Sequence, residues 1–193
     1  HPAPLSGVAE HSRYESDPLG RLAGTTRWLT VTTFAAAEVI EREAARVNAM
    51  HEHVKGEFKN KQGHEQVYRA KDPRFLLWVH CAFTDSFLKA HLALGYSIDQ
   101  GADAYVEQWS KSAVPLGLTN APMSVAELEA ALDDFRINDL ATVARTAEVV
   151  RFILNPPFDG AGKFFYKVIS NAAIATLHQH ELTLLGLEKR SKL

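Results

Sequence analysis

Helix-start signals recur along this chain, and they constrain its fold more strongly than any other feature. Asp17-Pro18 and Asp72-Pro73 each place a capping carboxylate before a proline at the first helical position. Ser124 and Glu127 form a capping box just after Pro122. No run of β-branched and aromatic residues long enough for a strand lies between turn signals. The pattern therefore predicts helices and no sheet.

The segments between these signals have helical composition. Arg74 to Leu94 is apolar on most sides, which is typical of a helix at the centre of a bundle. Ala35 to Met50 mixes apolar and charged side chains at helical spacing and predicts an amphipathic surface helix. Gly56 to Gly63 is polar and bounded by glycines, so it predicts a loop. We therefore predict an all-α domain of about seven helices, over residues 18–34, 35–54, 73–94, 101–113, 124–136, 139–154 and 162–185.

The length and composition exclude several classes of protein. A chain of 193 residues that is 46% hydrophobic and 23% charged is expected to fold as one globular domain over residues 1–193. The net charge of −2 gives no electrostatic attraction to nucleic acid. No apolar stretch predicts a transmembrane segment. Cys81 is the single cysteine, which excludes intramolecular disulfides, and its apolar surroundings predict a core residue.

The two ends of the chain bear on its location. No basic-then-apolar signal segment begins the sequence, which favours a cytoplasmic protein. The last three residues, Ser191-Lys192-Leu193, spell a peroxisomal signal. That signal applies only in a eukaryote and only at a native C-terminus.

Histidines are the main candidates for a metal or cofactor site. His51 lies one helical turn after Val47 and is predicted to project from the apolar side, whereas His53 is turned about 200° towards solvent. His80 lies inside the most apolar helix. A neutral imidazole in apolar surroundings suits a haem iron or another transition metal. The alternative is a core histidine that is hydrogen-bonded to a carbonyl, and composition alone favours that alternative.

A second candidate constellation lies on the helix that follows Asp17. Arg21 and Thr25 are four residues apart, about 40° in helical phase, so they share a face. A guanidinium beside a hydroxyl can donate to a propionate, a peroxide or a developing oxyanion. Gly24 would let a flat ligand approach the helix backbone. The alternative is a surface arginine with a threonine that bonds back to a carbonyl.

Six short motifs occur in a fixed order over most of the chain. They are G-V-A-E-H-S (7–12), S-D-P-L-G-R-L-x-x-T (16–25), V-N-A-M-H-x-x-V-x-G (47–56), Y-R-A-K-D-P-R-F-L-L-W-V-H (68–80), D-A-Y-V (103–106) and P-M-S-x-x-E-L (122–128). Together they resemble the rubber oxygenase (latex-clearing protein) and MpaB-type oxygenase family. The resemblance runs from His1 to about Leu187.

The resemblance implies a helical bundle of the haem-pocket type that holds haem b, with a histidine as the iron ligand. The position in V-N-A-M-H-x-x-V-x-G assigns that ligand to His51. The R-L-x-x-T helix would lie over the haem, which makes Arg21 and Thr25 the catalytic candidates. His80 and His11 are the further cofactor-binding candidates. Family domains also have helical sequence before the position of His1, so an N-terminal helical segment is expected to be missing.

Three functions follow from these patterns. The leading hypothesis is a haem-dependent oxygenase-like protein that acts on a hydrophobic small molecule. The alternative is a non-catalytic helical protein of the same fold that binds a ligand or a partner, favoured by Gly24 where rubber-cleaving members carry lysine. A di-metal site is the third hypothesis, but no histidine has a glutamate three residues before it on a shared core helix.

Overall fold

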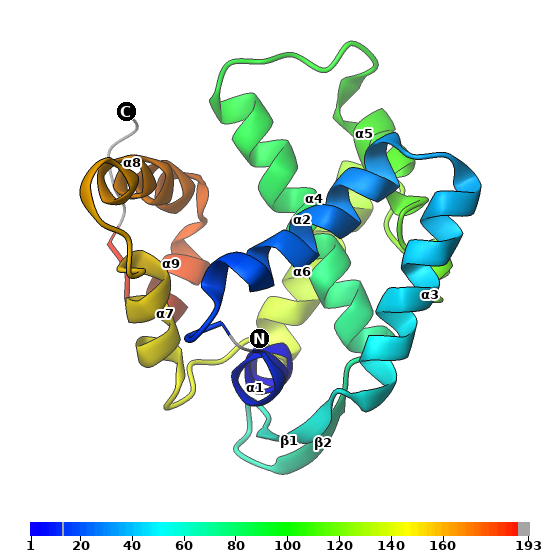
Figure 1. Cartoon of the computed structure of the whole chain (residues 1–193). Coiled ribbons are helices and arrows are strands. Elements are labelled where there is room, and N and C mark those ends of the chain that lie inside the picture. The colour runs from blue at the N-terminus through cyan, green and yellow to red at the C-terminus, as the bar shows by residue number, and fades with distance from the viewer. Residues whose placement is uncertain (13, 189–193) are drawn as a thin grey trace.

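Helices make up most of the protein, and the computed structural model describes residues 1–12 and 14–188 (Figure 1). These residues contain nine α-helices, one short 3-10 helix (Val114–Leu116) and one two-stranded hairpin. The helices are α1 (Pro2–His11), α2 (Pro18–Phe34), α3 (Ala37–His53), α4 (Pro73–Ala93), α5 (Gly101–Ser110), α6 (Val125–Asn138), α7 (Thr146–Leu154), α8 (Gly160–Thr176) and α9 (Gln179–Leu185). The hairpin strands are β1 (Lys55–Lys59) and β2 (Glu65–Arg69).

The predicted helix starts are confirmed at the level of single hydrogen bonds. Asp17 accepts from the backbone N–H of Gly20 at 2.9 Å at the start of α2, and Asp72 accepts from that of Arg74 at 2.8 Å at the start of α4. Ser124 accepts from the backbone N–H of Glu127 at 3.2 Å at the start of α6. Each cap satisfies a donor that the first helical turn leaves unpaired.

Helix α4 is the central element, as its composition predicts, and it packs against α5, α6 and α8 (Figure 1). Its inner face joins a buried cluster made by Cys81, Leu88, Val106, Leu128 and Leu132. Burial raises the pKa of the Cys81 thiol to about 12, so the thiolate does not form near neutral pH. The prediction of a core cysteine is confirmed.

The prediction that the chain has no sheet is wrong, because β1 and β2 pair antiparallel with Lys55 opposite Arg69. Each strand is mostly polar and has one buried aromatic side chain, Phe58 in β1 and Tyr68 in β2. Neither strand therefore has the apolar run from which a strand is predicted. The turn is closed by the Asn60 side chain, which accepts from the backbone N–H of His64 at 2.9 Å. The predicted loop from Gly56 to Gly63 is therefore a strand in its first half and a turn in its second half.

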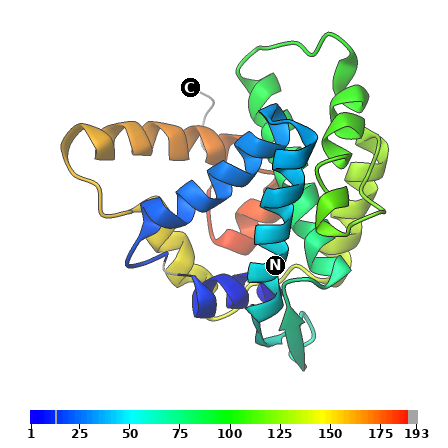
Figure 2. The ribbon, with the colours of Figure 1, turned by 45° about the vertical axis from the view of Figure 1, so that its right-hand side comes forward.

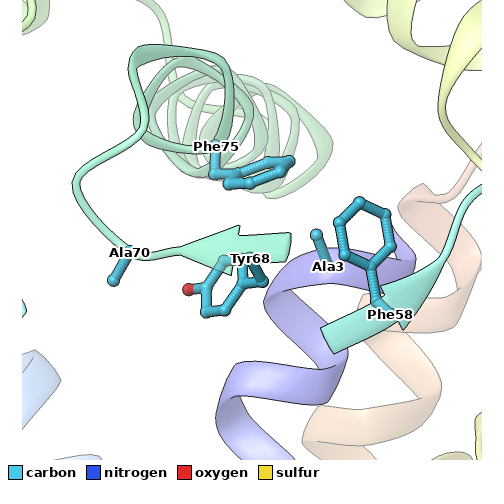
Figure 3. Close-up of a cluster of buried hydrophobic side chains, with 5 residues drawn as sticks. All are labelled: Ala3, Phe58, Tyr68, Ala70 and Phe75. Atoms are coloured by element: carbon cyan, nitrogen blue, oxygen red, sulfur yellow. The ribbon is translucent and has the colours of Figure 1, made fainter. Parts of the chain in front are cut away.

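Helix α1 was not predicted from the sequence, and it covers the hairpin. Figure 3 shows Ala3 of α1 facing Phe58 and Tyr68 of the strands and Phe75 of α4. The rings of Tyr68 and Phe75 lie 5.1 Å apart. Two prolines in the first turn of α1 require no hydrogen-bond acceptor there, so the helix begins directly at Pro2. The helix also has a cap, because His1 Nδ1 accepts from the backbone N–H of Ala3 at 3.2 Å, and packing against the hairpin adds to these local effects.

Two further helix predictions need correction. The helix predicted over 139–154 begins only at Thr146, and the one predicted over 162–185 divides into α8 and α9. The backbone is extended at Leu177 and His178, which separates these two helices. Figure 2 shows α8 standing out from the rest of the molecule. The Ser191-Lys192-Leu193 signal lies outside the described residues.

Gly7 tests the contact between α1 and the hairpin. A Cβ at this position would lie 2.3 Å from Cε1 of Tyr68, whose ring is buried. We expect Gly7→Ala to lower the free energy of unfolding by about 1–3 kcal/mol, as overpacking does. Gly162→Ala in α8 is the matched control, because its Cβ would meet only Phe158 Cβ at 3.9 Å. Thermal unfolding measures both, and equal midpoints for the two variants would contradict the packing argument.

Candidate functional site

A cavity of about 610 Å³ lies between α2, α3 and α4. In Figure 1, α2 crosses in front of α4, and α3 runs beside them. Residues of α1 and the end of the hairpin close one side, and residues from Trp109 to Leu118 close another. Cofactor and ligand sites span roughly 300–1,000 Å³, so this cavity has the size of a binding site.

Each of the three main helices contributes one stripe of side chains to the cavity wall. The stripe of α2 is Gly20, Arg21, Gly24, Thr25, Trp28 and Leu29. The stripes of α3 and α4 are Arg46, Val47, Met50 and His51, and Phe75, Leu76, Val79, His80 and Phe83. Spacings of three and four residues place each set on one helix face. The wall is therefore mainly apolar, with a few polar groups.

His51 lies in the cavity wall near the C-terminal end of α3, on the side that the sequence predicts. Its Nδ1 atom is buried and has no hydrogen-bond partner among the described residues. Burial lowers the pKa of His51, and the positive charges of Lys71 and Arg21 lower it further. The imidazole is therefore neutral at pH 7, which is the form that binds a metal. His53 is exposed, as predicted.

His80 lines the same cavity from α4 and is only 8% exposed. Its Nε2 atom is buried without a partner in the part of the chain that the structure describes, and burial lowers the pKa of the imidazole to about 4. A buried polar atom that lacks a hydrogen bond costs about 1–3 kcal/mol. The cavity wall thus contains two neutral imidazoles that each leave a ring nitrogen unpaired.

Arg21 and Thr25 share a face of α2, as the sequence predicts. Arg21 Nη1 donates to Thr25 Oγ1 at 2.5 Å, and both residues line the cavity. Arg21 is exposed, as the alternative of a surface arginine expects. A Cβ at Gly24 would meet no atom within 4 Å, so the helix surface beside this pair is open.

His11 and Ser12 lie at the end of α1, at the edge of the cavity. His11 Nε2 bonds the backbone oxygen of Lys55 at 2.7 Å, which ties α1 to the hairpin and occupies one ring nitrogen. Ser12 Oγ is buried and has no partner within residues 1–12 and 14–188. Sequence reasoning missed Ser12 as a site residue, although it ends the motif G-V-A-E-H-S.

Glu43 fixes the position of α2 over the cavity. It is 3% exposed and accepts from Arg27 Nε of α2 at 2.9 Å and from Arg46 Nη2 at 2.6 Å. The hydrogen bonds from Arg46 lower the pKa of Glu43. Burial opposes this shift, and the hydrogen bond from Arg27 lowers the pKa further. A buried carboxylate between two guanidiniums therefore joins the two helices.

Helix α2 has no buried residue, which is unusual for a helix of 17 residues that crosses a domain. Its inner stripe faces the cavity instead of other side chains. An amphipathic helix normally gains most of its stability by burying one face. The packing of α2 is thus incomplete unless a molecule fills the space beneath it.

The side chains that could ligate a metal favour a cofactor that takes few ligands from the protein. Among residues 1–12 and 14–188, no three His, Cys, Asp or Glu side chains come together as a metal site would require. A haem iron takes only one or two ligands from the protein, because the macrocycle supplies four. Within the same residues, no helix is both long enough and apolar enough to cross a bilayer.

Comparison with known proteins gives one match. The sequence profile of the family described as ER-bound oxygenase mpaB/B'/Rubber oxygenase, catalytic domain, matches residues 1–192. No curated protein and no solved structure matches the chain.

Replacing Glu43 tests its role in holding α2. We expect Glu43→Gln to lower the free energy of unfolding at pH 7 by about 1–2 kcal/mol, because the charged hydrogen bonds weaken while both arginines remain solvated. Glu41→Gln is the matched control on the same helix, since Glu41 is exposed. Denaturant unfolding measures both variants.

The pH dependence gives a second test of Glu43. Because its pKa in the folded protein lies below the ordinary 4.5, the stabilisation is fully present above that pH. It is lost as the pH falls through the lowered pKa. The advantage of the wild type over Glu43→Gln is thus expected to shrink in acid. An advantage that grows on acidification would contradict the ion pairs described above.

Proposed function

Because the chain belongs to the family of ER-bound oxygenase mpaB/B' and rubber oxygenase catalytic domains, we propose that it is a haem b-dependent oxygenase-like protein. Its substrate would be a hydrophobic small molecule, and the activity would reside in residues 1–193 as one domain. The observation that carries the proposal is the pair of neutral imidazoles, His51 and His80, that line one mainly apolar cavity.

The residues around the cavity fit a flat, largely apolar cofactor. The stripes of α2, α3 and α4 supply an apolar wall, and α2 lacks packing where such a group would lie. Gly24 places only backbone at the middle of the α2 stripe. A macrocycle in this space would complete the burial of α2. This supports haem over a small metal ion, for which the wall offers no cluster of ligands among the described residues.

His51 would hold the iron, and His80 and His11 would complete the cofactor site. The neutral state of His51 favours this role, since a protonated imidazole cannot ligate a metal. Haem, when bound, supplies the chemistry of dioxygen, which no side chain can provide. The protein supplies position and exclusion of water, because the wall around the imidazoles is apolar.

Arg21 and Thr25, which line the cavity from α2, would act as catalytic residues. Their mutual hydrogen bond holds the guanidinium over the cavity, with its remaining N–H groups available as donors. These donors would stabilise negative charge on an oxygen atom or on a propionate. The open position at Gly24, where rubber-cleaving members of the family carry lysine, favours a substrate other than polyisoprene.

Haem binding by His51 can be tested by absorption spectroscopy. We expect protein made in haem-supplemented cells to show a Soret band that His51→Ala abolishes, because the iron loses its ligand. His53→Ala is the matched control, since His53 lies two residues away on the exposed side. A colourless protein that hemin does not reconstitute would overturn the proposal and leave the alternative, a non-catalytic ligand- or partner-binding protein.

The incomplete packing of α2 gives a test that does not depend on activity. We expect hemin to slow amide hydrogen exchange across Pro18–Phe34 by about tenfold or more, because the inner face of α2 becomes buried. Helix α9 contributes nothing to the cavity wall and serves as the internal control. Equal protection of α2 with and without hemin would place the cofactor elsewhere or exclude it.

A further inference from the structure

Helix α8 has an apolar face that the described part of the chain leaves uncovered. Phe164, Phe165 and Ile169 are 65%, 63% and 66% exposed, and Val168 is exposed beside them. We call these four side chains the α8 face. Figure 2 shows the first turns of α8 standing out from the rest of the molecule. Single exposed apolar residues are ordinary on a protein surface, whereas four large ones on one protruding helix indicate an interaction site.

The α8 face and the packed side of the helix point in opposite directions. At 100° per residue, the α8 face falls within an arc of about 140°. Tyr166 and Ile174 lie on the other side of the helix. Tyr166 donates to the backbone oxygen of Ile153 at 2.7 Å, and Ile174 is buried. Because a surface helix normally turns its apolar stripe inwards, the outward stripe of α8 requires an apolar environment outside the described chain.

The charge of α8 is positive only. Lys163 and Lys167 are both exposed, and Gly160–Thr176 contains no acidic residue. The nearest acidic residue in the sequence, Asp159, precedes the helix. The ion pairs among residues 1–12 and 14–188 involve neither lysine. Two free positive charges therefore accompany the α8 face, although the whole chain has a net charge of −2.

We propose that α8 lies flat on an anionic bilayer surface, with the α8 face at the boundary between headgroups and acyl chains. Helices that bind membranes in this way carry Phe or Leu on one face and Lys on the other, and they insert the apolar face by about 5–10 Å. A helix is about 10–12 Å across, which is close to the Debye length of about 8 Å, so lipid phosphates still attract both lysines. This inference goes beyond the proposed function and does not depend on haem.

A second copy of the chain fits the α8 face less well than a bilayer does. A stable dimer buries about 800 Å² on each partner, from about 20–30 residues, whereas the α8 face offers four large side chains. Two copies that met through α8 would also bring four lysines together and no carboxylate from the helix. An anionic bilayer instead neutralises the lysines and takes up apolar side chains without a shaped pocket.

Vesicle flotation of the whole chain tests the role of the lysines. We expect vesicles of phosphatidylcholine with about 30% phosphatidylserine to bind the protein at least about tenfold more tightly than pure phosphatidylcholine does, since each lysine contributes about fivefold. The double change Lys163→Gln and Lys167→Gln is expected to remove this difference. Lys111→Gln is the matched control, because Lys111 is exposed and lies outside α8.

The apolar contribution is tested with the same mixed vesicles. We expect the double change Phe164→Gln and Phe165→Gln to weaken binding at least about tenfold, because two aromatic rings no longer enter the bilayer. Phe34→Gln is the matched control, because Phe34 is 84% exposed at the end of α2. All three side chains are exposed, so thermal unfolding midpoints are expected to stay unchanged, which separates loss of binding from loss of folding.

A fluorescent label tests the orientation of α8. Cys81 is buried and the pKa of its thiol is raised to about 12, so a cysteine placed on the surface reacts in its stead. A nitrobenzoxadiazole label at Phe165→Cys is expected to emit at shorter wavelength when the mixed vesicles are added. The same label at Phe34→Cys is expected to keep its emission.

Three results would overturn the inference. The first is a wild type that does not bind the mixed vesicles, or that binds them as tightly after Phe164 and Phe165 are changed. The second is equal emission from the two labelled proteins. The third is a wild type that elutes as a dimer in size-exclusion chromatography while the variant with both phenylalanines changed elutes as a monomer, because the α8 face would then belong to a second copy.

Discussion

The site depends on a single buried carboxylate. Glu43 lies between Arg27 of α2 and Arg46 of α3. Its ion pair with Arg27 links α2 to α3. Without it, a helix that has no fully buried residue would keep only its half-buried side chains, such as Trp28 and Leu29, as tertiary contacts. The carboxylate thus allows α2 to span a cavity instead of filling it. Arg21 and Thr25 depend on that position, since they lie six and two residues before Arg27 on the same helix.

The region around the cavity is packed less completely than the rest of the protein, which reduces its stability. Close packing would fill the space between α2 and α4 with aliphatic side chains and would pair every buried polar atom. Instead, a cavity of about 610 Å³ remains there, and three residues that line it, Ser12, His51 and His80, each have a buried polar atom with no partner among the described residues. Features that reduce stability are expected to collect at functional sites. The rest of the α4 surface, around Cys81 and Leu88, is packed as an ordinary core.

Sequence patterns predict the elements whose signals are local, and they miss those that depend on distant contacts. The caps at Asp17, Asp72 and Ser124 locate three helix starts because each acts within one turn. The hairpin and α1 stabilise each other, through Phe58 and Tyr68 on one side and Ala3 on the other, so neither has a strong pattern alone. The side of α3 on which His51 lies follows from helical phase. That His51 and His80 face one cavity does not, because the packing of α3 and α4 decides it.

The walls that α2 and α4 contribute to the cavity therefore differ in polarity. On α2 the backbone is bare at Gly24, and the polar groups are a charged donor and a hydroxyl bonded to each other. On α4 the wall is apolar except for one neutral imidazole. A charged group on a bound molecule would find hydrogen-bond donors on the α2 wall, whereas the α4 wall offers apolar contact and one neutral polar side chain.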